Sequence, residues 1–213
     1  MNIDIAQKVV ELLNRLKNKK PLIHNITNYV TVNDCANILL AIGASPIMAD
    51  DLKEAEDITS IASALVINIG TLNERTIESM IASGKKANEL NIPVVLDPVG
   101  AGASLFRNET TKRILEEIKI SVLRGNMSEI KFIAGLESET KGVDASESDL
   151  KSDSDEGIRV ANSLAKRFNC TVAITGVCDI VSDGEKSVTI ENGTKMLSNV
   201  TGTGCMTTAL VGG

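Results

Sequence analysis

Short apolar runs that alternate with amphipathic segments are the feature of this sequence that most limits its fold. Nearly continuous runs of Ile, Leu, Val and Ala occur at residues 65–70, 93–98, 120–124 and 171–176. A run without polar alternation is typical of a strand covered on both faces, and helical patterns separate these runs from one another. Strand and helix in alternation imply a parallel sheet. We therefore predict an α/β fold of three layers, with helices on both faces of a mostly parallel central sheet.

Further elements flank these runs. We predict helices at 3–17, 31–42, 74–90 and 107–118, short strands at 21–24 and 45–48, and a hairpin at 180–190. Gly43 ends the second helix, and Asp183-Gly184 supplies the hairpin turn. A helix is expected to start at Asp50-Asp51, and residues 71–74 have the pattern of a capping box.

The negative charge of the chain is concentrated in one segment. Residues 137–157 hold eight acidic residues and two lysines, which accounts for the whole formal charge of −6, and the rest of the chain is balanced. We predict a solvated loop there, with a helix that begins near Ser154. A nucleic-acid surface would need a basic face, so nucleic acid is not expected as a partner.

A membrane and an oxidising compartment are not expected either. No apolar stretch approaches the roughly 18 residues that a membrane-spanning helix requires, and the N-terminal residues lack the order of a signal peptide. The four cysteines, Cys35, Cys170, Cys178 and Cys205, show no paired spacing and lie mostly among apolar neighbours, which is typical of reduced thiols. We expect a cytoplasmic protein.

Several polar residues and a glycine-rich loop follow the predicted strands directly. Because right-handed crossovers place all parallel strand ends at one edge, the loops after them should lie together. In a sheet of this kind the ligand crevice lies outside the carboxyl ends of the strands. We therefore expect Asp97, Asn126, Thr175 and the loop at Gly202 to converge there.

The stretch Asn199–Thr208 reads N-V-T-G-T-G-C-M-T-T, a glycine-rich loop that runs into the start of a helix. Glycines allow close approach to the backbone, so the N–H groups from Gly202 to Met206 could converge on an anion, helped by the positive end of the helix dipole. Cys205 lies where this helix begins. The loop is neither a dinucleotide fingerprint nor a Walker A loop. An ordinary turn with a buried cysteine remains the alternative.

The residues at the other strand ends each allow a chemical and a structural interpretation. Asp97 could bind Mg²⁺ or merely fix the turn before Pro98. In Arg124-Gly125-Asn126-Met127-Ser128-Glu129, the arginine could bind phosphate, and Asn126 and Glu129 could address one hydrated metal, although a Glu at a helix start is commonly a cap. Thr175 could contact a nucleotide phosphate. The polar run 25–28 could form a binding loop or only a local turn.

In combination, these motifs resemble a known family. The motifs are I-T-N from Ile26, G-A-S-P-I-M from Gly43, L-D-P-V-G-A-G from Leu96, R-G-N-x-x-E from Arg124 and V-T-G-T-G-C from Val200. They are similar to those of the hydroxyethylthiazole kinase family, within the ribokinase-like superfamily. The likeness runs from about Pro21 to the last residue. It implies a ribokinase-like fold with no separate lid domain, in a single kinase domain over residues 1–213 that lacks the C-terminal helices usual in the family.

The resemblance also implies an activity. The reaction would be ATP-dependent phosphorylation of the primary hydroxyl of 4-methyl-5-(2-hydroxyethyl)thiazole in thiamine salvage, with Mg²⁺ and in a homotrimer with sites between subunits. The implied site residues are Cys205, Gly202, Thr203 and Gly204 for catalysis; Arg124, Thr175 and Asn126 for ATP; Met48, Gly202 and Asn28 for the substrate; and Asp97 and Glu129 for the metal. Cys205 would orient the substrate hydroxyl or accept its proton.

Three other functions stay open at this point. A kinase of the same fold could act on a pyrimidine, pyridoxal or a sugar alcohol. A thiol enzyme could use Cys205 as nucleophile, but it would need a base, and the one histidine is His24. A binding protein without catalytic activity on the same fold is the third.

Overall fold

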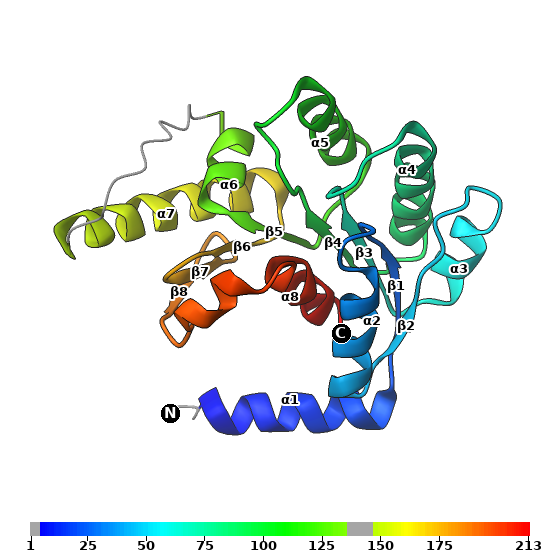
Figure 1. Cartoon of the computed structure of the whole chain (residues 1–213), viewed down its shortest axis with the longest axis horizontal. Coiled ribbons are helices and arrows are strands. Elements are labelled where there is room, and N and C mark those ends of the chain that lie inside the picture. The colour runs from blue at the N-terminus through cyan, green and yellow to red at the C-terminus, as the bar shows by residue number, and fades with distance from the viewer. Residues whose placement is uncertain (1–4, 136–146) are drawn as a thin grey trace.

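The computed structural model describes residues 5–135 and 147–213, which are built around one eight-stranded sheet (Figure 1). The strand order is β2-β1-β3-β4-β5-β6-β7-β8. The strands are β1 (Leu22–Ile26), β2 (Ser45–Ile47), β3 (Ala64–Asn68), β4 (Val94–Asp97), β5 (Val122–Asn126), β6 (Thr171–Thr175), β7 (Asp179–Ser182) and β8 (Ser187–Ile190). The first six strands are parallel, and β7 and β8 form the antiparallel hairpin. The mostly parallel sheet of the sequence prediction is confirmed.

Helices cover both faces of this sheet. They are α1 (Ile5–Lys19), α2 (Val32–Ile42), α3 (Ala55–Ile61), α4 (Glu74–Glu89), α5 (Leu105–Glu117), α6 (Met127–Ile133), α7 (Glu147–Phe168) and α8 (Thr203–Gly212), with a short 3₁₀ helix at Lys195–Asn199. In Figure 1, α3 to α7 lie on one side of the sheet, and α1, α2 and α8 on the other. No helix in the described part of the chain is long and apolar enough to cross a membrane.

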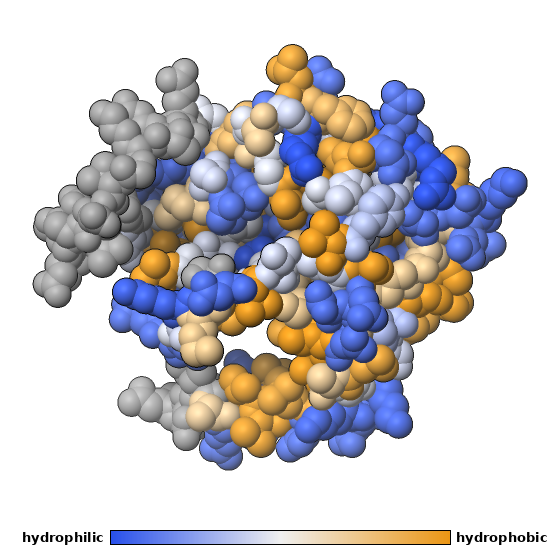
Figure 2. Space-filling view, viewed as in Figure 1, coloured by the Kyte–Doolittle hydropathy of each residue, from blue (hydrophilic) through white to orange (hydrophobic). Residues whose placement is uncertain are grey.

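Two apolar cores lie on the two faces, as the continuous apolar runs require. Every residue of β3 is buried, and alternate side chains enter opposite cores: Leu65 and Ile67 pack with α4, α5 and α7, whereas Val66 packs with α2 and α8. Successive side chains of a strand point to opposite faces, so a strand with apolar residues on both faces contributes to the cores on both sides of the sheet. The helix α1 lies apart from the sheet and leaves much of its apolar surface exposed, visible along the lower edge of Figure 2.

Three expected boundaries were wrong. The helix expected at Asp50-Asp51 begins at Ala55, because the Asp51 carboxylate accepts the Lys53 N–H at 3.0 Å and closes a turn first. The capping box expected at residues 71–74 is formed instead by Asn73 and Thr76. The helix expected near Ser154 begins at Glu147, since a helix already anchored by packing extends at little cost even through weak formers. Residues 137–146 of the expected acidic loop lie outside the described part.

The histidine His24 is a buried structural residue of β1. Its Nε2 donates to the Ala49 carbonyl at 2.7 Å, and its Nδ1 lies 2.9 Å from the Thr59 hydroxyl. Burial lowers the pKa of the imidazole below its ordinary value of 6.5. Because both ring nitrogens are engaged, away from Cys205, His24 is not placed to act as the base of a thiol enzyme.

We expect His24 to make the protein less stable in mild acid. Its pKa is lower in the folded state, so as the pH falls from neutral through the ordinary value of 6.5 the unfolded chain binds the extra proton, and unfolding becomes easier by up to about 1.4 kcal/mol per pH unit. Chemical denaturation across this range should show a shallower dependence on pH for His24→Gln than for the wild type. An identical pH dependence in the variant would contradict this assignment.

Candidate functional site

The ends of four parallel strands bring the expected polar residues together. Asn68 at the end of β3 is aligned with Asp97 at the end of β4, and Asn126 at the end of β5 is aligned with Thr175 at the end of β6. The helix α8 packs against β3 and β4 and delivers its N-terminal loop to the same edge. The expected convergence of Asp97, Asn126, Thr175 and the Gly202 loop is therefore observed.

Asp97 is the most deeply buried acid of this edge, with 0% of its surface exposed. Its Oδ2 accepts hydrogen bonds from Asn68 Nδ2 at 3.0 Å and the Thr208 hydroxyl at 2.6 Å. Its Oδ1 is buried and has no hydrogen-bond partner among the described residues. Burial raises the pKa of this carboxyl to about 6, although the nearby Arg124 opposes the rise. A buried oxygen with free lone pairs is the kind of group that a cation would satisfy.

Arg124 supplies the positive charge beside Asp97. Its side chain is largely buried; Nη1 lies 3.4 Å from Asp97 Oδ2, and Nη2 donates to the Thr175 hydroxyl. A Cβ atom on Gly204 would lie 2.7 Å from Nη1, so the backbone of the glycine loop rests directly against the guanidinium. Arg124 thus connects the acid of β4, the hydroxyl of β6 and the first turn of α8.

The N-terminus of α8 has no side-chain cap, so its backbone N–H groups are open to a ligand. Gly202 is the N-cap residue, with a φ of 83° that favours glycine, and a Cβ atom there would lie 2.0 Å from Thr31 Cγ2. The Met206 N–H donates to the Gly202 carbonyl, so Met206 belongs to the helix and not to the expected run of free donors. The donors available to an anion are those of the first turn, Thr203 to Cys205.

Cys205 lies in this first turn and contacts Asn28. The Asn28 Nδ2 donates to the Cys205 sulfur at 3.2 Å and to Asn68 Oδ1 at 3.0 Å. Met48, Cys205 and Met206 pack against the same core cluster. Of the expected substrate residues, Asn28 contacts the thiol directly, Gly202 is the N-cap of its helix, and Met48 packs against the same core cluster as Cys205.

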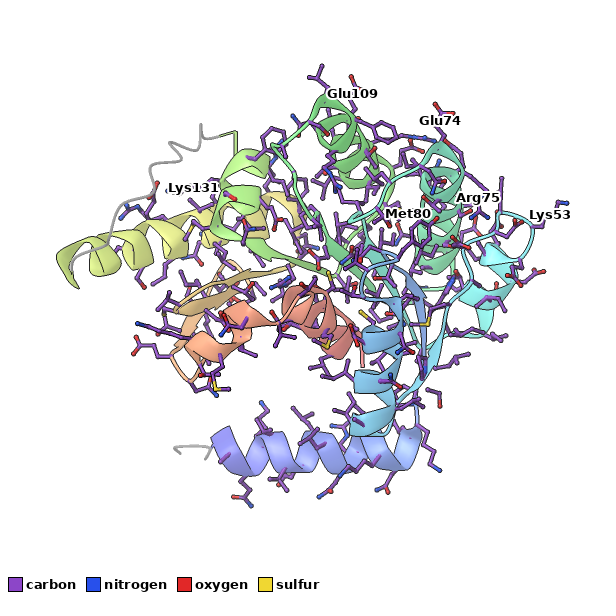
Figure 3. The ribbon with its side chains drawn as sticks, viewed as in Figure 1. Lys53, Glu74, Arg75, Met80, Glu109 and Lys131 are labelled. Atoms are coloured by element: carbon purple, nitrogen blue, oxygen red, sulfur yellow. The ribbon has the colours of Figure 1, made fainter. Side chains whose placement is uncertain are left out.

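The loop after Met48 is fixed from two sides. His24 holds the Ala49 carbonyl, and Arg75 at the start of α4 pairs with Asp50 at 3.2 Å and with Asp51 at 3.3 Å. Figure 3 labels Arg75 among the side chains of α4. The exposed ion pairs contribute little stability, so the buried histidine carries most of this anchoring.

Glu129 is a capping residue in this structure. Asn126 and Glu129 form a capping box, in which Glu129 Oε2 accepts the Asn126 N–H at 2.8 Å and Asn126 Oδ1 accepts the Glu129 N–H at 2.9 Å. Glu129 Oε1 accepts the Gly100 N–H at 2.8 Å and so holds the loop after β4. Within residues 5–135 and 147–213, no three His, Cys, Asp or Glu side chains are grouped as a metal site.

Comparison with known proteins identifies the family of this chain. The model of the hydroxyethylthiazole kinase family matches residues 13–213. The chain belongs to the hydroxyethylthiazole kinase family. A hydroxyethylthiazole kinase of Clostridium beijerinckii is 79% identical over 212 residues, which cover 100% of this chain and 77% of that protein. That of Ruminiclostridium cellulolyticum is 68% identical, over 98% of this chain and 76% of that protein.

Solved structures give the same relationship. The structure of a hydroxyethylthiazole kinase protein from Pyrococcus horikoshii OT3 aligns with a TM-score of 0.86 and 43% identity, over 97% of this chain and 75% of that one. A ribokinase-like superfamily protein from Enterococcus faecalis aligns with a TM-score of 0.59 at 9% identity, over 92% of this chain and 71% of that one. The second likeness shows that the ribokinase-like fold is shared.

Three residues of this family member were missed by the sequence analysis. Asn68 and Thr208 both donate to Asp97, and Arg107 donates to the carbonyls of Ile69, Gly70 and Val99 and so ties the loops after β3 and β4 together. Asn68 was detectable as a polar residue at the end of a buried strand. Thr208 and Arg107 lie inside helical patterns and carry no such signal.

Proposed function

We propose that this chain transfers the γ-phosphoryl group of ATP to the primary hydroxyl of 4-methyl-5-(2-hydroxyethyl)thiazole, the reaction of thiamine salvage. Its membership of the hydroxyethylthiazole kinase family supports the activity. The observation that carries the proposal is the open helix N-terminus at Gly202, set against the buried Arg124 guanidinium beside the buried acid Asp97. Backbone N–H donors and a cationic side chain that lie side by side form a site for the phosphoryl group, which carries negative charge while it is transferred.

Each residue then has a role in the transfer. The N–H groups of Thr203, Gly204 and Cys205 would hold oxygens of the moving phosphoryl group, while Arg124 and Thr175 would hold the phosphates of ATP on the other side of the loop, with Asn126 nearby at the end of β5. Cys205 would orient the substrate hydroxyl or accept its proton at the sulfur. Gly202 and Met48 would line the place of the thiazole.

One assay separates this function from its rivals. Release of ADP should be fast with the thiazole alcohol and slow with a hydroxymethylpyrimidine, pyridoxal or ribose, each tested at the same concentration. A faster reaction with any of the other three alcohols would assign the chain a different substrate. Complete inactivity with all four would favour a binding protein.

Mg²⁺ is the cation we propose for this site. Asp97 fits the ion because its Oδ1 is buried without a partner among the described residues. Glu129 fits only through water, because both of its oxygens already accept backbone N–H groups. Mg²⁺ prefers one or two carboxylates together with waters and substrate phosphates, and it would neutralise phosphate charge when bound. The residues of the chain would therefore supply part of its coordination.

Substitution of the two acids should change the requirement for the metal. We expect Asp97→Asn and Glu129→Gln to raise the Mg²⁺ concentration at half-maximal activity, with the larger shift for Asp97, whose free oxygen faces no competing donor. Activity measured against Mg²⁺ at constant ATP gives this value. A lower rate with an unshifted Mg²⁺ requirement would contradict a metal role for either residue.

We further infer that the domain of residues 1–213 works as a cytoplasmic homotrimer with sites between subunits. All four cysteines are free, which supports a reducing compartment. Beside Asn28, the apolar residues Tyr29 and Val30 are 63% and 64% exposed, and no lid covers them within the described residues. A neighbouring subunit would cover such a surface, and a ring requires a different surface on the next chain.

Light scattering should report a mass near three times 22.6 kDa at micromolar concentration. Replacement of the exposed apolar side chains, in a Tyr29→Ser, Val30→Ser variant, should lower the mass and raise KM for the thiazole. A wild-type monomer with full activity would contradict both the trimer and the shared site.

A further inference from the structure

The side-chain amide of Asn28 is fixed in one orientation by five hydrogen bonds. Its Oδ1 accepts from the N–H of Val30 at 3.1 Å, the N–H of Thr31 at 3.2 Å and the Thr31 hydroxyl at 3.1 Å. Its Nδ2 donates to Asn68 at 3.0 Å and to the Cys205 sulfur at 3.2 Å. Three donors on the oxygen exclude a flipped amide, and both N–H groups are already used. Asn28 therefore has no free donor for a substrate.

The Asn68 amide is fixed in the same way. Its Oδ1 accepts from Asn28 Nδ2 and from the Gly70 N–H at 2.9 Å, and its Nδ2 donates to Asp97 Oδ2 at 3.0 Å. Asn28, Asn68 and Asp97 are 4%, 2% and 0% exposed. An unbroken chain of hydrogen bonds thus runs from the Cys205 sulfur to the Asp97 carboxylate through two buried amides.

This hydrogen-bond network joins the two sides of the proposed transfer site. Cys205 lies at the helix start, on the side proposed for the substrate, and Asp97 lies beside Arg124, on the side proposed for the nucleotide. A Cβ atom on Gly70 would lie 2.8 Å from Asn28 Nδ2 and 2.9 Å from Asn68 Oδ1, so the backbone of the next loop packs closely over the amide pair. Buried amides that are held at both the oxygen and the nitrogen are rigid, because any movement breaks these hydrogen bonds and leaves a polar group unpaired.

We infer that Asn28 and Asn68 are positioning residues that hold the Cys205 sulfur at a fixed place relative to Asp97, and that Asn28 acts on the substrate only through Cys205. This inference rests on the proposed kinase function. It departs from the expectation that Asn28 contacts the substrate itself. The sulfur accepts the hydrogen bond from Asn28, so loss of the amide frees the thiol to rotate away from the hydroxyl.

A double-mutant cycle on kcat tests this directly. Asn28→Ser keeps an oxygen that can accept from residues 30 and 31 but removes both amide donors. In the wild-type background it should lower kcat by about tenfold or more, because a small displacement of a reacting group is costly, and leave KM for ATP unchanged. In the Cys205→Ala background the same substitution should change kcat by less than about twofold, since the residue it acts through is gone. Equal losses in both backgrounds would overturn the inference.

Asn68→Ser tests the same hydrogen-bond network at its Asp97 end, and it covers the case in which Asn28→Ser does not fold. Asn68 does not contact the sulfur, yet the effect of its substitution on kcat should also disappear in the Cys205→Ala background. A loss of kcat that persists in that background would contradict the role of the network. Asn25→Ser is the matched control. Asn25 is an equally buried asparagine of β1 that donates to the Ile23 carbonyl and not to this network, so kcat should stay unchanged in both backgrounds.

The wild-type rate separates the two proposals. If the wild type phosphorylates the thiazole alcohol and the cycle is additive, the kinase function stands and the positioning role is lost. If the wild type does not phosphorylate this alcohol, the proposed function itself fails, and the positioning inference falls with it.

Discussion

Replacement of Arg124 by methionine is expected to lower kcat by about 100- to 1000-fold, the loss typical when one preorganised group that stabilises developing negative charge is removed. The substitution keeps the bulk of the side chain but leaves Asp97 without its cationic neighbour and Thr175 without its donor. Removal of one member of a buried ion pair also destabilises a protein by about 3–5 kcal/mol, so unfolding must be measured together with steady-state rates.

One further variant separates the charge of Arg124 from its geometry, and another serves as a control. Arg124→Lys keeps the charge but cannot reproduce both guanidinium contacts, so we expect a smaller loss of stability than for Arg124→Met and a KM for ATP above the wild-type value. Arg113→Met is the matched control, because Arg113 pairs with Glu78 and Glu117 on the exposed side of α4 and α5. Exposed pairs contribute little, so its kcat should not change. Near-normal kcat in folded Arg124→Met would remove this residue from the mechanism.

Cys205→Ala is expected to fold normally and to lower kcat by about ten- to a thousandfold, the lower part of that range being typical of a positioned proton acceptor. The thiol is only half-buried, so its removal leaves no large cavity in the core. KM for ATP should stay close to the wild-type value, because the backbone N–H groups of the first turn of α8 are retained.

Cys170→Ala is the control for this substitution. Cys170 is a buried thiol just before β6, at the amino end of the strand and away from the transfer edge. It should lower stability through lost packing and leave kcat unaffected. If Cys205→Ala retained wild-type kcat, Cys205 would be only a packing residue of the helix start, and the positioning role of Asn28 would fall with it.

The fold was predictable because its information is local. The runs at β3, β4 and β6 are so apolar that helices must cover both faces of the sheet. The helices between them follow from the helical spacing of apolar residues, which is clear over the 16 residues of α4. The errors were at boundaries such as α3 and α7, where single side-chain hydrogen bonds and extension of a packed helix decide the first residue. These depend on neighbours that a pattern of residue types does not contain.

The site was predictable as an edge of the sheet but not as a network. The positions of Asp97 and Thr175 follow from topology, since parallel strands end together. The contact of Asn28 with Cys205 joins residues 177 positions apart, and no local pattern encodes it. The same holds for the unpaired oxygen of Asp97, which depends on how tightly α8 and β5 close around it. Side-chain contacts between residues far apart in the sequence therefore could not be predicted from local patterns.

The most direct test of the central claim is to identify the phosphorylated product. Purified protein is incubated with ATP, Mg²⁺ and the thiazole alcohol and followed by phosphorus NMR, with Arg124→Met in parallel. We predict a phosphate monoester signal, coupled to the protons of the adjacent CH₂ group, that grows in step with ADP and forms far more slowly with the variant. ADP accompanied only by inorganic phosphate, or an ester formed equally fast by Arg124→Met, would contradict transfer at this edge of the sheet.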